Sequence, residues 1–116
     1  MRHHNANRKF GRERGQRKAL LRSLASSLIL RGKIQTTPEK AKELRPFVER
    51  LVTKAKNPIL ANRRLIQKRI GSALVTGRLI KDIASKYKKR NGGYTRIIKT
   101  ATYKKDGAAQ SIIEFV

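Results

Sequence analysis

Two adjacent histidines near the start of the chain are the side chains best suited by type to hold a metal ion. His3 and His4 are the only histidines in this 116-residue sequence, which contains no cysteine. A zinc site needs further nitrogen, sulfur or carboxylate ligands at suitable spacing, and none accompanies this pair. We therefore interpret both histidines as solvated side chains and predict no metal site.

Acidic residues are the next candidates, because two carboxylates held close together can act as general acid and base. Glu39, Glu43 and Glu49 lie in one predicted helix among the cations Lys40, Lys42 and Arg45. Opposite charges three or four residues apart attract each other on a helix face. We expect these acids to be partners of the cations rather than a catalytic pair.

Signatures of a nucleophile or of a phosphate-binding loop are incomplete. Ser26 and Ser27 lie in a predicted helix with no histidine near them in the sequence, and Gly92-Gly93 is not followed by the Gly-Lys-Ser/Thr of a P-loop. Nothing assembles a nucleophile, a base and an orienting group. The sequence therefore predicts a protein that is not an enzyme and that uses neither a cofactor nor a small-molecule substrate.

The basic residues carry the chemistry that this sequence does offer. Thirty Lys and Arg stand against seven Asp and Glu, which gives a formal net charge of +23. A polyanion relieves the repulsion among such charges, and its binding gains entropy from the release of counterions. Nucleic acid is the first candidate partner, and an anionic membrane surface is the second.

An apolar stretch at 19–30 follows the basic start of the chain, as it would in a signal peptide. Arg22 interrupts the stretch and its leucines recur at helical spacing, so we interpret it as an amphipathic core helix. No apolar run approaches the roughly 20 residues that span a bilayer. We therefore expect no membrane partner.

Residues 1–15 differ in composition from the rest of the chain. They hold five Lys or Arg and one acid, with Phe10 as the only large apolar side chain beyond Met1. Such a segment buries too little surface to offset the entropy lost on ordering. We predict a basic arm over 1–15, extended when it meets RNA, and a single domain over 16–116.

Apolar periodicity predicts about four helices in that domain, over 16–31, from 38 to about 55, from 57 to about 70, and from 75 to 86. Thr36 or Thr37 can cap the second helix, with Glu39 completing a capping box from Thr36. Pro46 interrupts the apolar stripe of this helix, but we retain one helix. Asn57, followed by proline, predicts the N-cap of the third.

Three segments are predicted to be strands, at 33–36, 94–103 and 111–116, the last two joined at the turn signal Asp106-Gly107. Together the elements predict an α+β domain, in which a small mixed or antiparallel three-stranded sheet packs against the helices.

The cations are spread over the arm, the flanks of several helices and one loop, whereas a DNA-reading protein usually concentrates its contacts on one element. Spread charge suits a protein that touches several RNA segments. Tyr94 could stack on a base or pack in the sheet. The predicted RNA contacts are Arg2, His3, Arg8, Lys9, Arg12, Arg14, Arg17, Lys18, Arg22, Arg63, Arg64, Lys88, Lys89, Arg90, Tyr94 and Arg96.

Several short motifs occur in order along the chain, namely Met1–His3, Gln16–Ala19 with Arg22, Ser27-Leu28, Ile34–Thr37, Lys40–Glu43, Arg63-Arg64, Gly92–Ile97 and Ile112–Glu114. In sequence and spacing they resemble a known family, the seventeenth protein of the bacterial large ribosomal subunit. The resemblance implies an α+β fold with a basic N-terminal extension. It also implies binding to large-subunit (23S-type) rRNA on the solvent side near the exit tunnel, beside neighbouring large-subunit proteins of the cytoplasmic ribosome.

The chain departs from the family pattern in three places. Gln16 stands where members often have histidine, Pro46 is unusual in the second helix, and residues 71–84 match only loosely. No individual contact is carried over into that last segment.

A DNA-compacting architectural protein is the main alternative, but it would be expected to show an apolar dimer core and a β-arm with an intercalating wedge. A membrane-active or secreted cationic protein would need a helix face rich in Trp or Phe. An RNA-acting enzyme would need an acid/base cluster.

Overall fold

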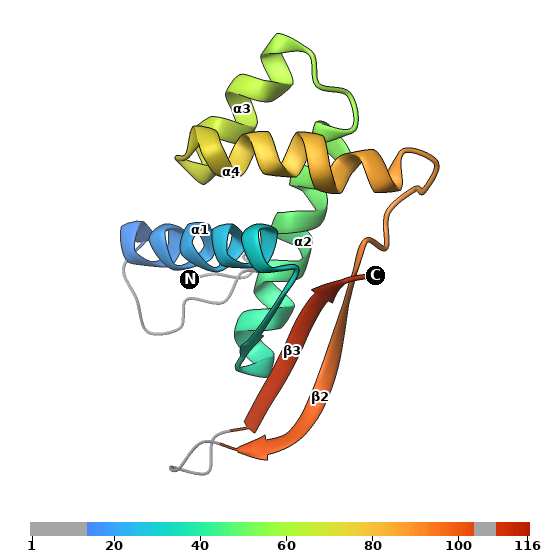
Figure 1. Ribbon diagram of the computed structural model, residues 1–116. Helices are drawn as coiled ribbons and strands as arrows, with labels where there is room; N and C mark the ends of the chain where they lie inside the picture. The colour runs from blue at the N-terminus through green and yellow to red at the C-terminus, as the bar shows by residue number, and fades with distance from the viewer. Residues whose placement is uncertain (1–13, 104–108) are drawn as a thin grey trace, which may run out of the picture.

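The structure, a computed structural model, describes residues 14–103 and 109–116 (Figure 1). The elements are α1 (Arg14–Arg31), β1 (Lys33–Thr36), α2 (Pro38–Ala55), α3 (Leu60–Ile70), α4 (Ala73–Arg78), η1 (Leu79–Ile83), η2 (Ala84–Tyr87), β2 (Thr95–Tyr103) and β3 (Ala109–Phe115). The strands form one antiparallel sheet in the order β1-β3-β2. The predicted α+β fold is confirmed.

Helix α2 is the centre of the domain, and it contacts α1, α3 and the sheet. Its apolar stripe is fully or almost fully buried: Ala41, Leu44, Val48, Leu51, Val52 and Ala55. Each large aliphatic side chain buried in this way stabilises the fold by about 1.5–3 kcal/mol. Pro46 lies on the exposed side of α2, and the helix runs through it, so the prediction of a single helix is confirmed.

The start of α2 differs in one detail from its prediction. Thr37 is the N-cap, and its hydroxyl accepts a hydrogen bond from the backbone amide of Lys40 at 3.4 Å. Thr36 is the last residue of β1, so the prediction of a capping box from Thr36 to Glu39 was wrong. Because Thr36 pairs with β3, its backbone belongs to the sheet and not to the helix.

The third helix also begins later than predicted. Asn57 is not its N-cap; Ile59 holds that position, with no side-chain cap. The carbonyl of Asn57 accepts hydrogen bonds from the amide of Ile59 and from the side chain of Asn62, at 2.9 and 2.7 Å. These bonds close a tight turn ahead of α3 and shift the start of the helix.

Gly71 separates α3 from α4 in the left-handed conformation with φ 79°, so the third helix ends near residue 70 as predicted. The helical run that follows changes its hydrogen-bond pattern twice. α4 continues into one π-helical turn, η1, and then into one 3₁₀ turn, η2. The predicted helix over 75–86 is therefore a composite of three short pieces, starting two residues earlier.

The sheet has an inner face towards the helices and an outer face. Ile34, Ile113 and Ile97 lie side by side in register, and Ile113 is fully buried. The next register row puts Lys33, Glu114 and Arg96 on the opposite face. The predicted turn at 106–107 lies outside the described residues, as does most of the predicted arm; Arg14 and Gly15 already belong to α1.

Candidate nucleic-acid interface

Acidic side chains of the described residues are largely taken up by contacts within the domain. Glu49 accepts hydrogen bonds from the amide and hydroxyl of Thr95, at 3.2 and 2.8 Å, and pairs with Arg45 at 3.5 Å. This contact confirms that Glu49 is a partner of a helix cation. The acids are few, and most of the cations among the described residues are exposed to solvent.

Two further acids each pair with one cation. Asp82 lies 3.2 Å from Arg78, and Glu114 lies 2.8 Å from Arg96 across the outer face of the sheet. Arg96, a predicted RNA contact, is therefore ion-paired, although 60% of its side chain is exposed. An RNA phosphate would have to share Arg96 with Glu114.

Predicted contacts in the first helix lie along one edge of α1. Arg14, Lys18 and Arg22 are four residues apart, and all three are exposed. Arg17 is partly buried. The remaining contacts predicted near the start of the chain lie outside the described residues: Arg2, His3, Arg8, Lys9 and Arg12.

Arg22 has a structural contact that the sequence did not predict. Its Nε donates a hydrogen bond of 3.0 Å to the backbone carbonyl of Arg69, in the last turn of α3. Its side chain also crosses Gly71, where an added Cβ would lie 3.4 Å from the guanidinium and from Cδ. Arg22 thus links the end of α3 to α1 through this hydrogen bond.

The other predicted cations lie at different ends of the domain. Arg63 and Arg64 are exposed on α3, and Arg63 donates through Nε to the carbonyl of Pro58 at 3.0 Å. Lys88, Lys89 and Arg90 are exposed in the loop that follows η2. In Figure 1, α1 begins on the left, α3 lies at the top, and this loop lies on the right.

Tyr94 is a packing residue, which is one of the two roles that the sequence left open, so its inclusion among the RNA contacts was wrong. It is 1% exposed, and its ring lies 5.2 Å from that of Tyr87. Its hydroxyl contacts Thr53 at 3.2 Å and accepts from Lys56 Nζ at 3.0 Å. A ring enclosed in this way presents no face to a base.

The two buried tyrosines differ in acidity. Burial raises the pKa of Tyr94, but hydrogen bonds with Thr53, Lys56 and the backbone of Gly92, with the charge of Lys56, outweigh it and leave the pKa below its ordinary value. Burial raises the pKa of Tyr87, and the charge of Arg90 offsets this only in part. The Tyr87 hydroxyl donates to the carbonyl of Val116.

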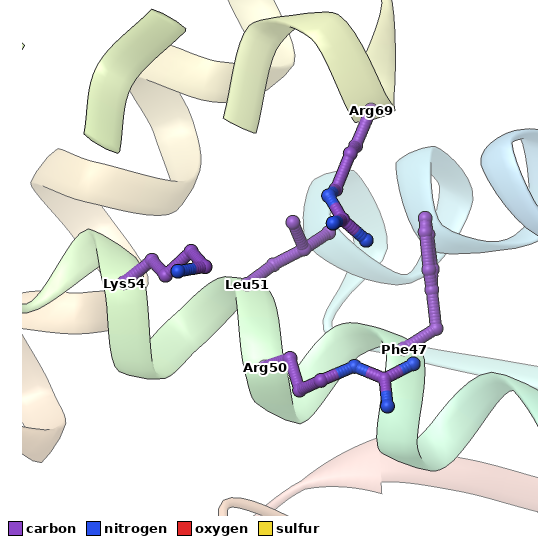
Figure 2. A pocket seen from close by; sticks show the side chains of 5 residues that line it. All are labelled: Phe47, Arg50, Leu51, Lys54 and Arg69. Carbon is purple, nitrogen blue, oxygen red and sulfur yellow. The ribbon is translucent and has the colours of Figure 1, made fainter. Parts of the chain in front are cut away.

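A second group of cations, absent from the predicted contacts, surrounds a hollow of about 270 Å³ between α2 and the end of α3. We name it the α2–α3 hollow, and it is lined by Phe47, Arg50, Leu51, Lys54 and Arg69. Figure 2 shows Arg69 reaching from α3 towards α2, and Phe47 extending from α2. Each of these cations looks like an ordinary surface residue in the sequence, because the hollow forms only when α2 and α3 pack.

Within the described ranges, no three His, Cys, Asp or Glu residues come together in a way that could hold a metal ion. No helix in that part of the chain is both long and apolar enough to cross a membrane. The geometry therefore offers exposed cations on several sides of a small core as its principal chemical feature.

Comparison with known proteins agrees with this geometry. A family model described as ribosomal protein L17 matches residues 20–116. A large ribosomal subunit protein bL17 from Nautilia profundicola is 49% identical over 120 residues, covering 100% of this chain and 98% of the relative. Similar proteins of that name occur in Gemmatimonas aurantiaca, at 49% identity with 98% of the relative covered, and in Campylobacter jejuni, at 47% with 99% covered; both matches span 100% of this chain.

Proposed function

The chain belongs to the ribosomal protein L17 family, and from that premise we propose that it binds and stabilises large-subunit rRNA as a structural constituent of the bacterial large ribosomal subunit. The family is one of structural ribosomal proteins and not of enzymes. The proposed location, on the solvent side near the exit tunnel, is supported by the family resemblance alone.

One observation supports RNA binding most strongly: exposed cations extend from several elements in different directions. α1, α3 and the loop after η2 each carry a group, and these groups lie at separate ends of the domain (Figure 1). A phosphate backbone contacted from several sides neutralises such a surface. A single flat duplex face would leave part of it unpaired.

We assign the contacts to exposed members of these groups. On α1 they are Arg14, Lys18 and Arg22, and on α3 and the loop after η2 they are Arg63, Arg64, Lys88, Lys89 and Arg90. Arg96, exposed on β2, is added to them. Arg17, partly buried on α1, is retained as a flanking contact. Guanidinium groups suit phosphate better than ammonium groups do, because two parallel donors match two phosphate oxygens.

The basic arm is the second part of the proposal. Residues 1–15 contain five Lys or Arg and one acid, and we propose Arg2, His3, Arg8, Lys9 and Arg12 as contacts within it. Composition supports this role: the segment has little apolar surface and a high density of charge. The globular domain, predicted over residues 16–116, would then follow, with Arg14 and Gly15 at the junction already in α1.

Filter binding of the full chain to a large-subunit rRNA fragment tests the proposal. The logarithm of the affinity should fall linearly with the logarithm of salt concentration, by roughly 0.7 to 0.9 for each phosphate neutralised. Duplex DNA of equal length is the control for an architectural DNA-binding protein. A flat salt response, or tighter binding to the DNA, would contradict the proposal.

A further inference from the structure

We infer that the α2–α3 hollow binds one nucleotide of single-stranded RNA, with the phosphate among Arg50, Lys54 and Arg69 and the base against Phe47. The inference rests on the proposed function and adds a ligand class to it. It also adds four contact residues that the sequence patterns did not single out.

The charges around the hollow favour the binding of an anion. Three of its five lining residues are cations and none is an acid. Arg50 and Lys54 are one turn apart on α2, and Arg69 approaches from α3 (Figure 2). Three like charges around one small space repel each other, and a phosphate among them would remove that repulsion.

These cations also lack competing partners. In the part of the chain that the structure describes, no hydrogen bond or ion pair joins the side chain of Arg50, Lys54 or Arg69 to another protein group. Glu49, which precedes Arg50, is already held by Thr95 and Arg45. The donors of the three side chains therefore remain available to a ligand.

The apolar part of the lining favours a base as the second half of the ligand. Phe47 is half-buried against the core, and Leu51 is 1% exposed at the inner side of the hollow. A base in a duplex is already stacked, whereas an unpaired base can turn outward and lie against an aromatic side chain. A hollow of about 270 Å³ is small, which suits one base rather than a longer ligand.

One hydrogen bond outside the hollow holds its α3 side in place. The hydrogen bond of 3.0 Å from Arg22 Nε to the carbonyl of Arg69 fixes the last turn of α3 against α1. Arg22 is therefore a positioning residue for this site: it holds the backbone from which the Arg69 side chain extends.

Fluorescence anisotropy with labelled oligoadenylate, and with duplex RNA of equal phosphate number, tests the inference on the full chain. Arg50→Gln, Lys54→Gln and Arg69→Gln each remove one charge at the hollow. Lys86→Gln removes one charge from an exposed position in η2 and is the matched control. Phe47→Leu removes the ring but keeps an apolar side chain.

Each of the three charge variants, Arg50→Gln, Lys54→Gln and Arg69→Gln, should weaken oligoadenylate binding about tenfold, as expected for a lost charge-assisted hydrogen bond. The Lys86→Gln control should weaken it about twofold, as for a screened surface charge. Phe47→Leu should weaken oligoadenylate binding about fivefold, because base–aromatic stacking is lost, and should leave duplex binding unchanged. Circular dichroism melting curves check that each variant is folded. Arg50 is exposed, so Arg50→Gln tests the hollow without changing the packing of the core.

If the variants of the hollow lost no more affinity for oligoadenylate than Lys86→Gln does, the inference would be overturned. RNA binding by the wild-type chain would still support the proposed function in that case. Equal losses of affinity for oligoadenylate and for duplex RNA in the variants of the hollow would also overturn the inference. A charge-matched oligoglutamate that displaced oligoadenylate at a lower concentration than unlabelled RNA does would overturn it as well. Failure of the wild-type chain to bind any RNA would overturn both proposals.

Discussion

The ammonium group of Lys56 lies 3.0 Å from the hydroxyl of Tyr94 and 5.2 Å from the centre of its ring. The same group donates a hydrogen bond to the backbone carbonyl of Arg90. Lys56 directly follows α2, whereas Arg90 and Tyr94 flank the turn that leads into β2. One side chain thus fastens the basic loop after η2 to the central helix.

Replacement of Lys56 by methionine should lower the free energy of unfolding by about 1–2 kcal/mol, because a part-buried hydrogen bond to Tyr94 and an exposed one to the carbonyl of Arg90 are lost. Lys54→Met is the matched control, since the Lys54 side chain has no such bond within the described residues, and its effect should stay below about 0.5 kcal/mol. Urea denaturation measures both. Equal effects of the two substitutions would contradict this role of Lys56.

Tyrosine ionisation provides a pH test of the same contact. Tyr103→Phe removes the third tyrosine of the chain, so that only Tyr87 and Tyr94 titrate. In this background the pKa of Tyr94 should lie below the ordinary value of 10.0 and the pKa of Tyr87 above it. Ionisation of Tyr94 therefore adds stability above its unfolded pKa, whereas the contribution of Tyr87 is lost as pH rises through its raised folded pKa. Ultraviolet absorbance of tyrosinate follows both groups, and Lys56→Met should raise the pKa of Tyr94. One transition above 10.0 for both residues would contradict this assignment.

Two glycines should respond in opposite directions to alanine. Gly71 has φ 79°, and an added Cβ would lie 3.4 Å from Arg22, so Gly71→Ala should destabilise the domain by about 1–2 kcal/mol. Gly77 lies inside α4 with nothing within 4 Å of an added Cβ, so Gly77→Ala should stabilise it by about 0.5–1 kcal/mol. Chemical denaturation should show opposite signs, and a shared sign would count against the observed end of α3.

The elements with strong local signals could be predicted from the sequence. α1 ends at Arg31, directly before Gly32, and α2 begins at Pro38 after its cap Thr37, with its apolar stripe buried, because periodicity and capping chemistry act over a few residues. Asn57 misled the prediction of α3, because its backbone carbonyl accepts hydrogen bonds from the amide of Ile59 and the side chain of Asn62. These bonds form a turn in place of a helix cap at Asn57. The π-helical turn η1 has no comparable sequence signal.

The candidate site was less accessible to prediction, because it depends on packing. Density of charge could indicate a polyanion partner, but not that Arg69 would face Arg50 and Lys54 across a hollow. The sequence also could not decide whether Tyr94 stacks or packs; a contact with Lys56 and Thr53, some forty residues away, decided it.

RNA should raise the thermal stability of the isolated chain. The +23 charge repels itself on a small core, and a ligand that binds the folded state shifts the equilibrium towards it. A large-subunit rRNA fragment at 100 times its dissociation constant should add about 2.7 kcal/mol. Differential scanning calorimetry measures the change. An unchanged melting temperature, or one above about 90 °C without RNA, would contradict this expectation.

The most direct test of the central claim is sedimentation of the tagged chain from bacterial lysate on sucrose gradients. At high magnesium the chain should sediment with intact ribosomes, and after their dissociation at low magnesium it should remain with the large subunit. Recovery at the top of the gradient, with the small subunit, or with nucleoid DNA would contradict the account.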